Sequence, residues 1–191
     1  MALDLKRRRF TVAEYYQMAL AGILGEDDRV ELIEGEIVEM TPIGARHAEC
    51  VDRLTEFFFR AFGGAARLRV QNPVRLGEHS EPQPDVALVH RRAGLYGSGH
   101  PTPEDILLLV EVADSSADPD RRVKVPLYAR SGIQEVWLVD LEQETITIYR
   151  DPAPDGYRSA RVARRGDELA PISFPDLVLK AADLIPGLAE D

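Results

Sequence analysis

Apolar and polar positions follow a helical period at the start of the chain and a strand period soon after. Residues 11–14 have the capping-box pattern, and the apolar positions behind them predict a helix that ends near Gly22. Residues 29–40 alternate on either side of Glu34 and Gly35, which predicts a β-hairpin. Residues 46–62 return to helical spacing. The pattern therefore predicts a helix, a hairpin and a second helix.

The middle and end of the chain read mainly as short strands. We expect strands at residues 68–71, 73–76, 85–89, 106–112, 135–140, 145–150 and 157–163. We expect helices at residues 115–130 and 174–184. A helix between two strands is typical of a right-handed crossover, so strands 106–112 and 135–140 should be parallel. The pattern predicts an α/β fold with a mixed central sheet flanked by helices.

Composition is that of a globular domain. With 191 residues, of which 45% are hydrophobic and 29% charged, we expect a single domain over residues 1–191 with its core at about 46–150. The one cysteine, Cys50, excludes an internal disulfide and agrees with a reducing compartment. No apolar run of about 18 residues is present, and no apolar segment follows the basic residues 6–9. We expect a cytoplasmic protein that is not in a membrane.

The net charge of −10 argues against a strong general affinity for nucleic acid, because proteins that bind it usually carry a basic surface. Positive charge is confined to short groups, most of which we expect to be solvated surface. These groups are residues 6–9, Arg67 with Arg69, Arg91 with Arg92, residues 121–124, and Arg164 with Arg165.

Two apolar strand patterns each carry one carboxylate at an edge. Asp85 starts the segment 85–89, and Glu111 lies near the end of the segment 106–112. A buried carboxylate is costly unless it is paired, so either acid alone would be explained by a turn or an arginine. If the strands are antiparallel neighbours, however, both acids meet at one edge of the sheet. Such hard oxygen ligands suit Mg²⁺ or Mn²⁺.

A lysine follows on the next predicted helix. Lys124 lies four residues before Tyr128, so both should project from one helix face. A lysine beside a bound metal could orient the attacking water or stabilise charge on a phosphate. Most lysines are simply exposed, which is the alternative explanation. Two acids and a lysine around a divalent metal suit phosphodiester hydrolysis.

Several short segments, in this order, resemble the Uma-type family of bacterial proteins, which is placed in the PD-(D/E)XK, or restriction-endonuclease-like, superfamily. The resemblance covers about residues 10–150. It implies a restriction-endonuclease-like fold and a nuclease that depends on Mg²⁺ or Mn²⁺. It implies a nucleic-acid partner, with DNA favoured over RNA, and superfamily members often form homodimers. The segments are residues 31–37, 83–85, 110–112, 124–128 and 132–137.

The resemblance also implies roles for individual residues. It assigns catalytic positions to Asp85, Glu111, Lys124 and Glu31. It implies that a metal is held by Asp85, Glu111 and the main-chain carbonyl of Val112. Gln83 and Tyr128 would support these residues, and a histidine that matches His47 would lie near the site. A role in a local turn or helix cap is the alternative explanation for His47.

The chain departs from the superfamily pattern at two positions. Ala113 stands where the pattern has a lysine, whose place Lys124 would take on the helix. Pro126 inside the predicted helix would kink it, unless the helix begins later. Glu34 and Glu36 are rival acids beside Glu31, which only the resemblance favours. The alternatives are a catalytically inactive binding module of the same fold and a hydrolase of another phosphoester.

Overall fold

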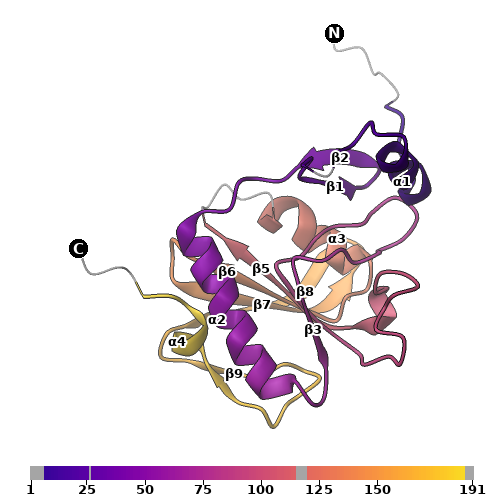
Figure 1. Ribbon diagram of the computed structural model, residues 1–191. Coiled ribbons are helices and arrows are strands. Elements are labelled where there is room, and N and C mark those ends of the chain that lie inside the picture. Colours follow the sequence, from indigo (N-terminus) through magenta and orange to yellow (C-terminus); the bar gives the residue numbers. More distant parts are fainter. Residues whose placement is uncertain (1–6, 26, 115–119, 188–191) are drawn as a thin grey trace.

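A six-stranded mixed sheet forms the centre of the computed structural model, which describes residues 7–25, 27–114 and 120–187 (Figure 1). The strands lie in chain order, and neighbours are antiparallel except for the parallel pair β5 and β6. The predicted parallel pair and the α/β fold class are confirmed. The strands are β3 Arg67–Val70, β4 Val86–Val89, β5 Ile106–Ala113, β6 Glu135–Asp140, β7 Thr145–Ala153 and β8 Gly156–Arg164.

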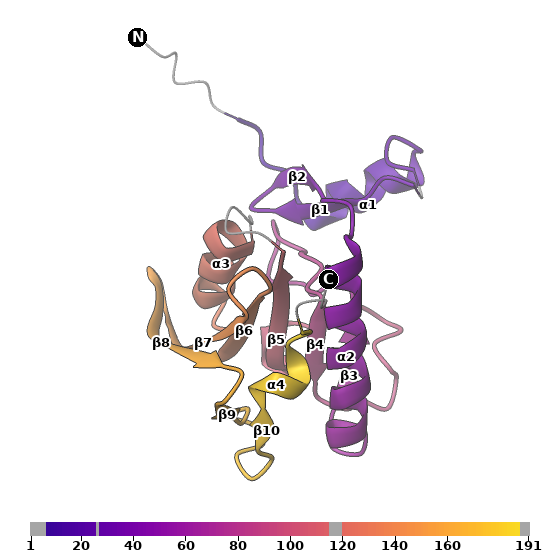
Figure 2. The same cartoon turned by 90° about the vertical axis from the view of Figure 1, so that its left-hand side faces the viewer.

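The predicted N-terminal helix and hairpin are present as α1 (Val12–Leu20), β1 (Val30–Ile33) and β2 (Glu36–Glu39). The Thr11 side chain caps α1 as expected. Glu34 and Gly35 both have positive φ, 48° and 78°, as a two-residue hairpin turn requires. Figures 1 and 2 show the hairpin lying across one end of the central sheet.

Helices cover both faces of the sheet. The long helix α2 (Ala45–Phe62) packs on one face and α3 (Val125–Arg130) on the other (Figure 2). Strand alternation divides the core accordingly: Val86 packs in the cluster that contains the α2 residues, and Ala87 in the cluster that contains Tyr128. The sheet therefore has two buried faces, and its strand ends lie between the two helices.

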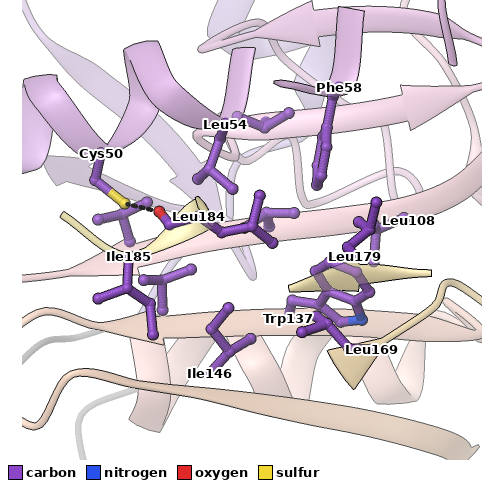
Figure 3. Close-up of a cluster of buried hydrophobic side chains, with 14 of the residues drawn as sticks. Cys50, Leu54, Phe58, Leu108, Trp137, Ile146, Leu169, Leu179, Leu184 and Ile185 are labelled. Atoms are coloured by element: carbon purple, nitrogen blue, oxygen red, sulfur yellow. Dashed lines mark hydrogen bonds between the residues drawn. The ribbon is translucent and has the colours of Figure 1, made fainter. Parts of the chain in front are cut away.

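The core beneath α2 joins the sheet to the C-terminal segment. Figure 3 shows Cys50, Leu54 and Phe58 of α2 facing Trp137 of the sheet, with Leu179 and Leu184 closing the cluster. The Cys50 thiol donates a hydrogen bond to the Leu184 carbonyl over 3.6 Å. Cys50 is fully buried, so its prediction as a core residue is confirmed.

The region around Lys124 corrects one prediction. Residues 115–119 of the expected helix lie outside the described residues. Asp120–Lys124 forms one π-helical turn, and the α-helix α3 starts only at Val125. Pro126 lies in the first turn of α3, directly after the π-helical turn, so its missing N–H coincides with the change from π-helical to α-helical bonding. The α-helix begins later than its pattern predicts.

Two further predictions of secondary structure are wrong. Residues 73–76 form no strand, because the Val74 and Arg75 N–H groups bond to the carbonyls of Pro82 and Pro101 in neighbouring loops. In the 174–184 segment only α4 (Ala181–Leu184) is helical.

The C-terminal segment instead starts with a turn, in which the Leu177 N–H bonds to the Phe174 carbonyl. It then forms β10 (Leu179–Lys180), which pairs with β9 (Glu168–Leu169). Buried pairing of Leu179 with Leu169 overrides the local helical spacing. A 3₁₀ turn at Pro103–Asp105 completes the assigned elements. No helix in the described part of the chain is long and apolar enough to cross a bilayer.

Candidate active site

A cavity of about 350 Å³ is lined both by residues of the hairpin and by residues at the end of the central sheet. Asp85 immediately precedes β4, and Glu111 is near the end of β5. Antiparallel pairing, with Val86 opposite Val110, brings the two acids to one sheet end. The Asp85 N–H donates to Glu111 Oε2 over 3.3 Å, and both side chains line the cavity. The predicted meeting of the two carboxylates is therefore observed.

Asp85 is held by donors from three directions. The Val112 N–H donates to Asp85 Oδ2 over 2.9 Å, and His47 Nε2 lies 3.0 Å from the same oxygen. The Gln71 amide donates to Oδ1 over 3.2 Å. With the residue only 7% exposed, these contacts replace the lost hydration of the carboxylate and fix its orientation.

Glu111 is held by side chains of the segment that follows β5. The Tyr128 hydroxyl donates to Glu111 Oε1, and Lys124 Nζ lies 3.7 Å from that oxygen. Both donors come from the π-helical turn and helix that follow β5, four residues apart. Glu111 is 1% exposed, so these contacts replace the hydration that its side chain loses on burial. Tyr128 supports Glu111 without lining the cavity itself.

Glu31 of the hairpin completes the cluster. Its Oε2 lies 3.3 Å from Lys124 Nζ and accepts a hydrogen bond of 3.0 Å from the Gln83 N–H. Lys124 therefore links an acid of the hairpin to an acid of the sheet. The rival acids are elsewhere: Glu34 pairs with Arg130, and Glu36 with arginines of the N-terminal segment, both at the surface.

The structure thus brings every predicted site residue to this end of the sheet. Tyr128 lies directly behind Glu111. The other predicted residues line the cavity: Glu31, His47, Gln83, Asp85, Glu111, Val112 and Lys124. Gln71 was not predicted as a site residue, because its contact with Asp85 depends on the pairing of β3 with β4. Asp114 and Arg29 in the cavity wall were not predicted either. One sequence feature could have identified Asp114: it is an acid that directly follows the strand β5.

Cys50 takes no part in this chemistry, although it lies one helical turn from His47. Burial raises the pKa of the Cys50 thiol to about 12, and the nearby charge of Asp85 also raises it. The thiol is therefore neutral near pH 7 and is a poor metal ligand. Oxygen atoms remain the relevant donors in the cavity.

The oxygen donors fit a divalent cation with few protein ligands. Within the described residues, no three or more His, Cys, Asp or Glu side chains are grouped as a complete metal cage. Asp85 Oδ1 accepts one hydrogen bond from those residues, which leaves a lone pair for a cation. Mg²⁺ commonly binds one or two carboxylates and keeps several waters. Two adjacent carboxylates beside a cavity match that requirement.

Comparisons with known proteins agree with this architecture. A structure of a putative nuclease belonging to DUF820 from Anabaena variabilis ATCC 29413 superposes with a TM-score of 0.69 at 19% identity, covering 92% of this chain and 97% of that one. At this identity the likeness shows a shared fold. No curated protein matches the chain. Residues 12–182 match the Uma2 family, described as "Putative restriction endonuclease". Because that match spans most of the sequence and confirms the resemblance of its motifs, this chain belongs to the Uma2 family.

Proposed function

We propose that this protein is a metal-dependent nuclease that hydrolyses phosphodiester bonds, in DNA rather than RNA. The observation that carries the proposal is the position of Lys124 Nζ between Glu31 and Glu111, beside Asp85, in one cavity. Membership of the family described as "Putative restriction endonuclease" supports a nuclease-like role. The metal, the type of nucleic acid and the residue roles are our inference.

In this proposal Asp85, Glu111 and the main-chain carbonyl of Val112 hold Mg²⁺ or Mn²⁺. Such an ion would offset charge on the phosphate oxygens and make a water molecule more acidic. Lys124 supplies a fixed positive charge to the phosphate and positions the attacking water. Glu31 holds the ammonium of Lys124 within reach of the cavity.

Other residues keep the acids in place. His47 and Gln71 fix the two oxygens of Asp85, and Tyr128 fixes Glu111. Gln83 holds Glu31 through its main-chain N–H. Partners of this kind typically contribute about 10- to 100-fold to metal affinity or activity, because they set the orientation of each ligand.

The test compares two buried aspartates. Asp85→Asn should lower DNA cleavage in Mg²⁺ or Mn²⁺ by at least about 100-fold, because it removes a proposed metal ligand. Asp105→Asn is the matched control: Asp105 is similarly buried, at 4% exposure, but lies at the far end of β5 and pairs with Arg92. Nicking of plasmid DNA and cleavage of labelled DNA and RNA strands would be followed with each metal and with EDTA. Equal loss in both variants would contradict the proposal.

The inactive binding module is the second candidate. Ala113 in the usual lysine position and the net charge of −10 favour it, whereas Pro126 no longer does, since it lies in the first turn of α3. Calorimetric titration of Mn²⁺ separates the candidates. Uptake by the wild type that Asp85→Asn abolishes supports the nuclease. Nucleic-acid binding with no cleavage under either metal supports the module.

A further inference from the structure

The edge strand β3 carries two arginines whose charge has no carboxylate partner. Arg67 and Arg69 are half-buried, and the Nε atom of each is buried without an acceptor among the described residues. Arg69 makes one polar contact there, of 3.4 Å, with the amide oxygen of Asn72. No salt bridge within the described chain includes either residue. An uncompensated guanidinium pair is unusual in a half-buried position.

The other half-buried arginines in the described part of this acidic protein are hydrogen-bonded. Arg75 and Arg150 each place the guanidinium against a buried carboxylate, Glu81 at 2.8 Å and Glu135 at 2.6 Å. Arg165 donates to the main-chain carbonyls of Ile185 and Pro186 over 3.0 and 3.4 Å. The exposed Arg92 pairs with the buried Asp105. Since the chain has ten more negative than positive charges, lack of acids does not explain the unpaired arginines of β3.

Arg67 and Arg69 form a cationic strip along β3, and the ring of Tyr96 packs against part of this strip. Tyr96 lies between two arginines, with the Arg69 Cζ 5.7 Å and the Arg92 Cζ 4.9 Å from its ring centroid. The Tyr96 hydroxyl is anchored by donation to the His90 carbonyl over 2.7 Å. Burial lowers the pKa of Arg69, and the neighbouring Arg67 lowers it further. A bound anion would relieve both effects.

The residue that directly follows strand β3 along the chain lines the proposed catalytic cavity. Strand β3 ends at Val70, and the next residue, Gln71, lines the cavity and donates to Asp85. Arg69 is two residues before Gln71, or about 7 Å along the chain. Arg67 is one strand repeat further away. β3 is also the edge of the sheet opposite β8, so no strand covers its outer side in the described chain (Figure 2).

We propose that Arg67 and Arg69 form a phosphate-binding subsite for the nucleic-acid backbone that flanks the cleaved bond. Alternate residues of a strand share one face, so both guanidinium groups lie along one path to Asp85. Arginine forks match phosphate oxygens, and such contacts position a strand without reading its sequence. This local subsite reconciles a nucleic-acid substrate with the acidic net charge. It rests on the proposed function for the identity of the polyanion.

The experiment measures binding separately from cleavage. Fluorescence anisotropy would follow a labelled DNA duplex, and its single strand, in EDTA over a series of salt concentrations. In Arg67→Gln/Arg69→Gln, binding should weaken by about tenfold, and the slope of log K against log salt should become shallower by about 1 to 2. The matched control is Arg158→Gln/Arg161→Gln on β8, the opposite edge of the same sheet. It removes the same charge and should leave the slope unchanged.

The outcomes distinguish the subsite from the nuclease. A slope in the β3 variant equal to that of the control would overturn the subsite, while loss of cleavage in Asp85→Asn would still support the nuclease. If the wild type cleaves no nucleic acid but the β3 variant binds DNA more weakly than the wild type, the subsite is supported and the nuclease proposal is overturned. No binding of either probe by the wild type would overturn both. The Arg67→Lys/Arg69→Lys variant, which keeps the charge, should retain the salt slope and guards against misfolding.

Discussion

Glu111 and Glu135 are buried glutamates on adjacent strands, yet their surroundings are opposite in kind. Glu135 is fully buried and receives hydrogen bonds from Trp137, Arg150 and the Ile172 N–H, between 2.6 and 2.9 Å. Glu111 instead lines a cavity and has two further acids nearby. Burial alone therefore does not identify a functional carboxylate.

The balance of charge separates the two acids. Glu135 pairs with Arg150, so the two opposite charges compensate each other, and the pair stabilises the junction of β6 and β7. Lys124 lies within 4 Å of both Glu31 and Glu111. With Asp85 adjacent, negative charge is in excess around the cavity, and a bound divalent cation would restore the balance. Excess acid beside an open volume is the feature that points to function.

The largest expected effects come from neutralising each glutamate in turn. Glu135→Gln should destabilise the protein by about 2–3 kcal/mol, because Arg150 loses its buried partner but can partly reach solvent. Its melting temperature should fall by about 4–12 °C. Glu111→Gln should remain within about 1 kcal/mol of the wild type, since losing one of several like charges offsets the lost Lys124 contact. Its cleavage rate should fall by at least about 100-fold.

Thermal unfolding and DNA cleavage measured on the same preparations would check both variants. Glu135→Gln should cleave at the wild-type rate per folded molecule at a temperature well below its melting point. If Glu135→Gln lost cleavage while Glu111→Gln kept it, the contrast drawn between the two acids would be wrong.

The sequence allowed the two sheet acids to be predicted because strand period and polar strand ends are local features. Asp85 and Glu111 stand at the edges of apolar runs, and antiparallel pairing of those runs then places them together. Glu31 was different: alternation alone could not choose it over Glu34, and only the family resemblance did so. Its contact with Lys124 depends on how the hairpin lies across the sheet, which no local pattern encodes.

Tertiary contacts also explain the missed elements. Gln71 is the last residue of the predicted strand 68–71, where no local pattern marks it as functional, but the pairing of β3 with β4 directs its amide to Asp85. Leu179 fits a helical apolar face, yet pairing with Leu169 draws it into a small sheet. Pro126 reads as a helix breaker until the preceding π-helical turn places it in the first turn of α3. For Gln71 and Leu179 a distant contact outweighs a weak local preference, whereas for Pro126 the irregular turn just before it is decisive.

An intermediate effect is expected when Lys124 is replaced. Lys124→Met should destabilise the protein by about 2 kcal/mol in EDTA, because Glu31 and Glu111 lose a shared buried cation. Added Mn²⁺ should recover part of the loss by binding the folded state. The Glu31→Gln/Lys124→Met double variant should recover much of it without metal, since one charge of each sign is removed. Thermal unfolding with and without Mn²⁺ tests all three, and a wild-type melting temperature for Lys124→Met in EDTA would contradict the charge-balance explanation.

The smallest effect should come from the surface acid of the same hairpin. Glu34 pairs with Arg130 at 2.7 Å, but the two side chains are 51% and 41% exposed, so solvent screens the pair. Glu34→Gln should change stability by no more than about 0.5 kcal/mol and leave cleavage unchanged. Glu31→Gln, three residues earlier, should lower cleavage by about 10- to 100-fold through release of Lys124. Equal cleavage rates in these two variants would mean that the contact between Glu31 and Lys124 is structural, and that the functional excess of acid is limited to Asp85 and Glu111.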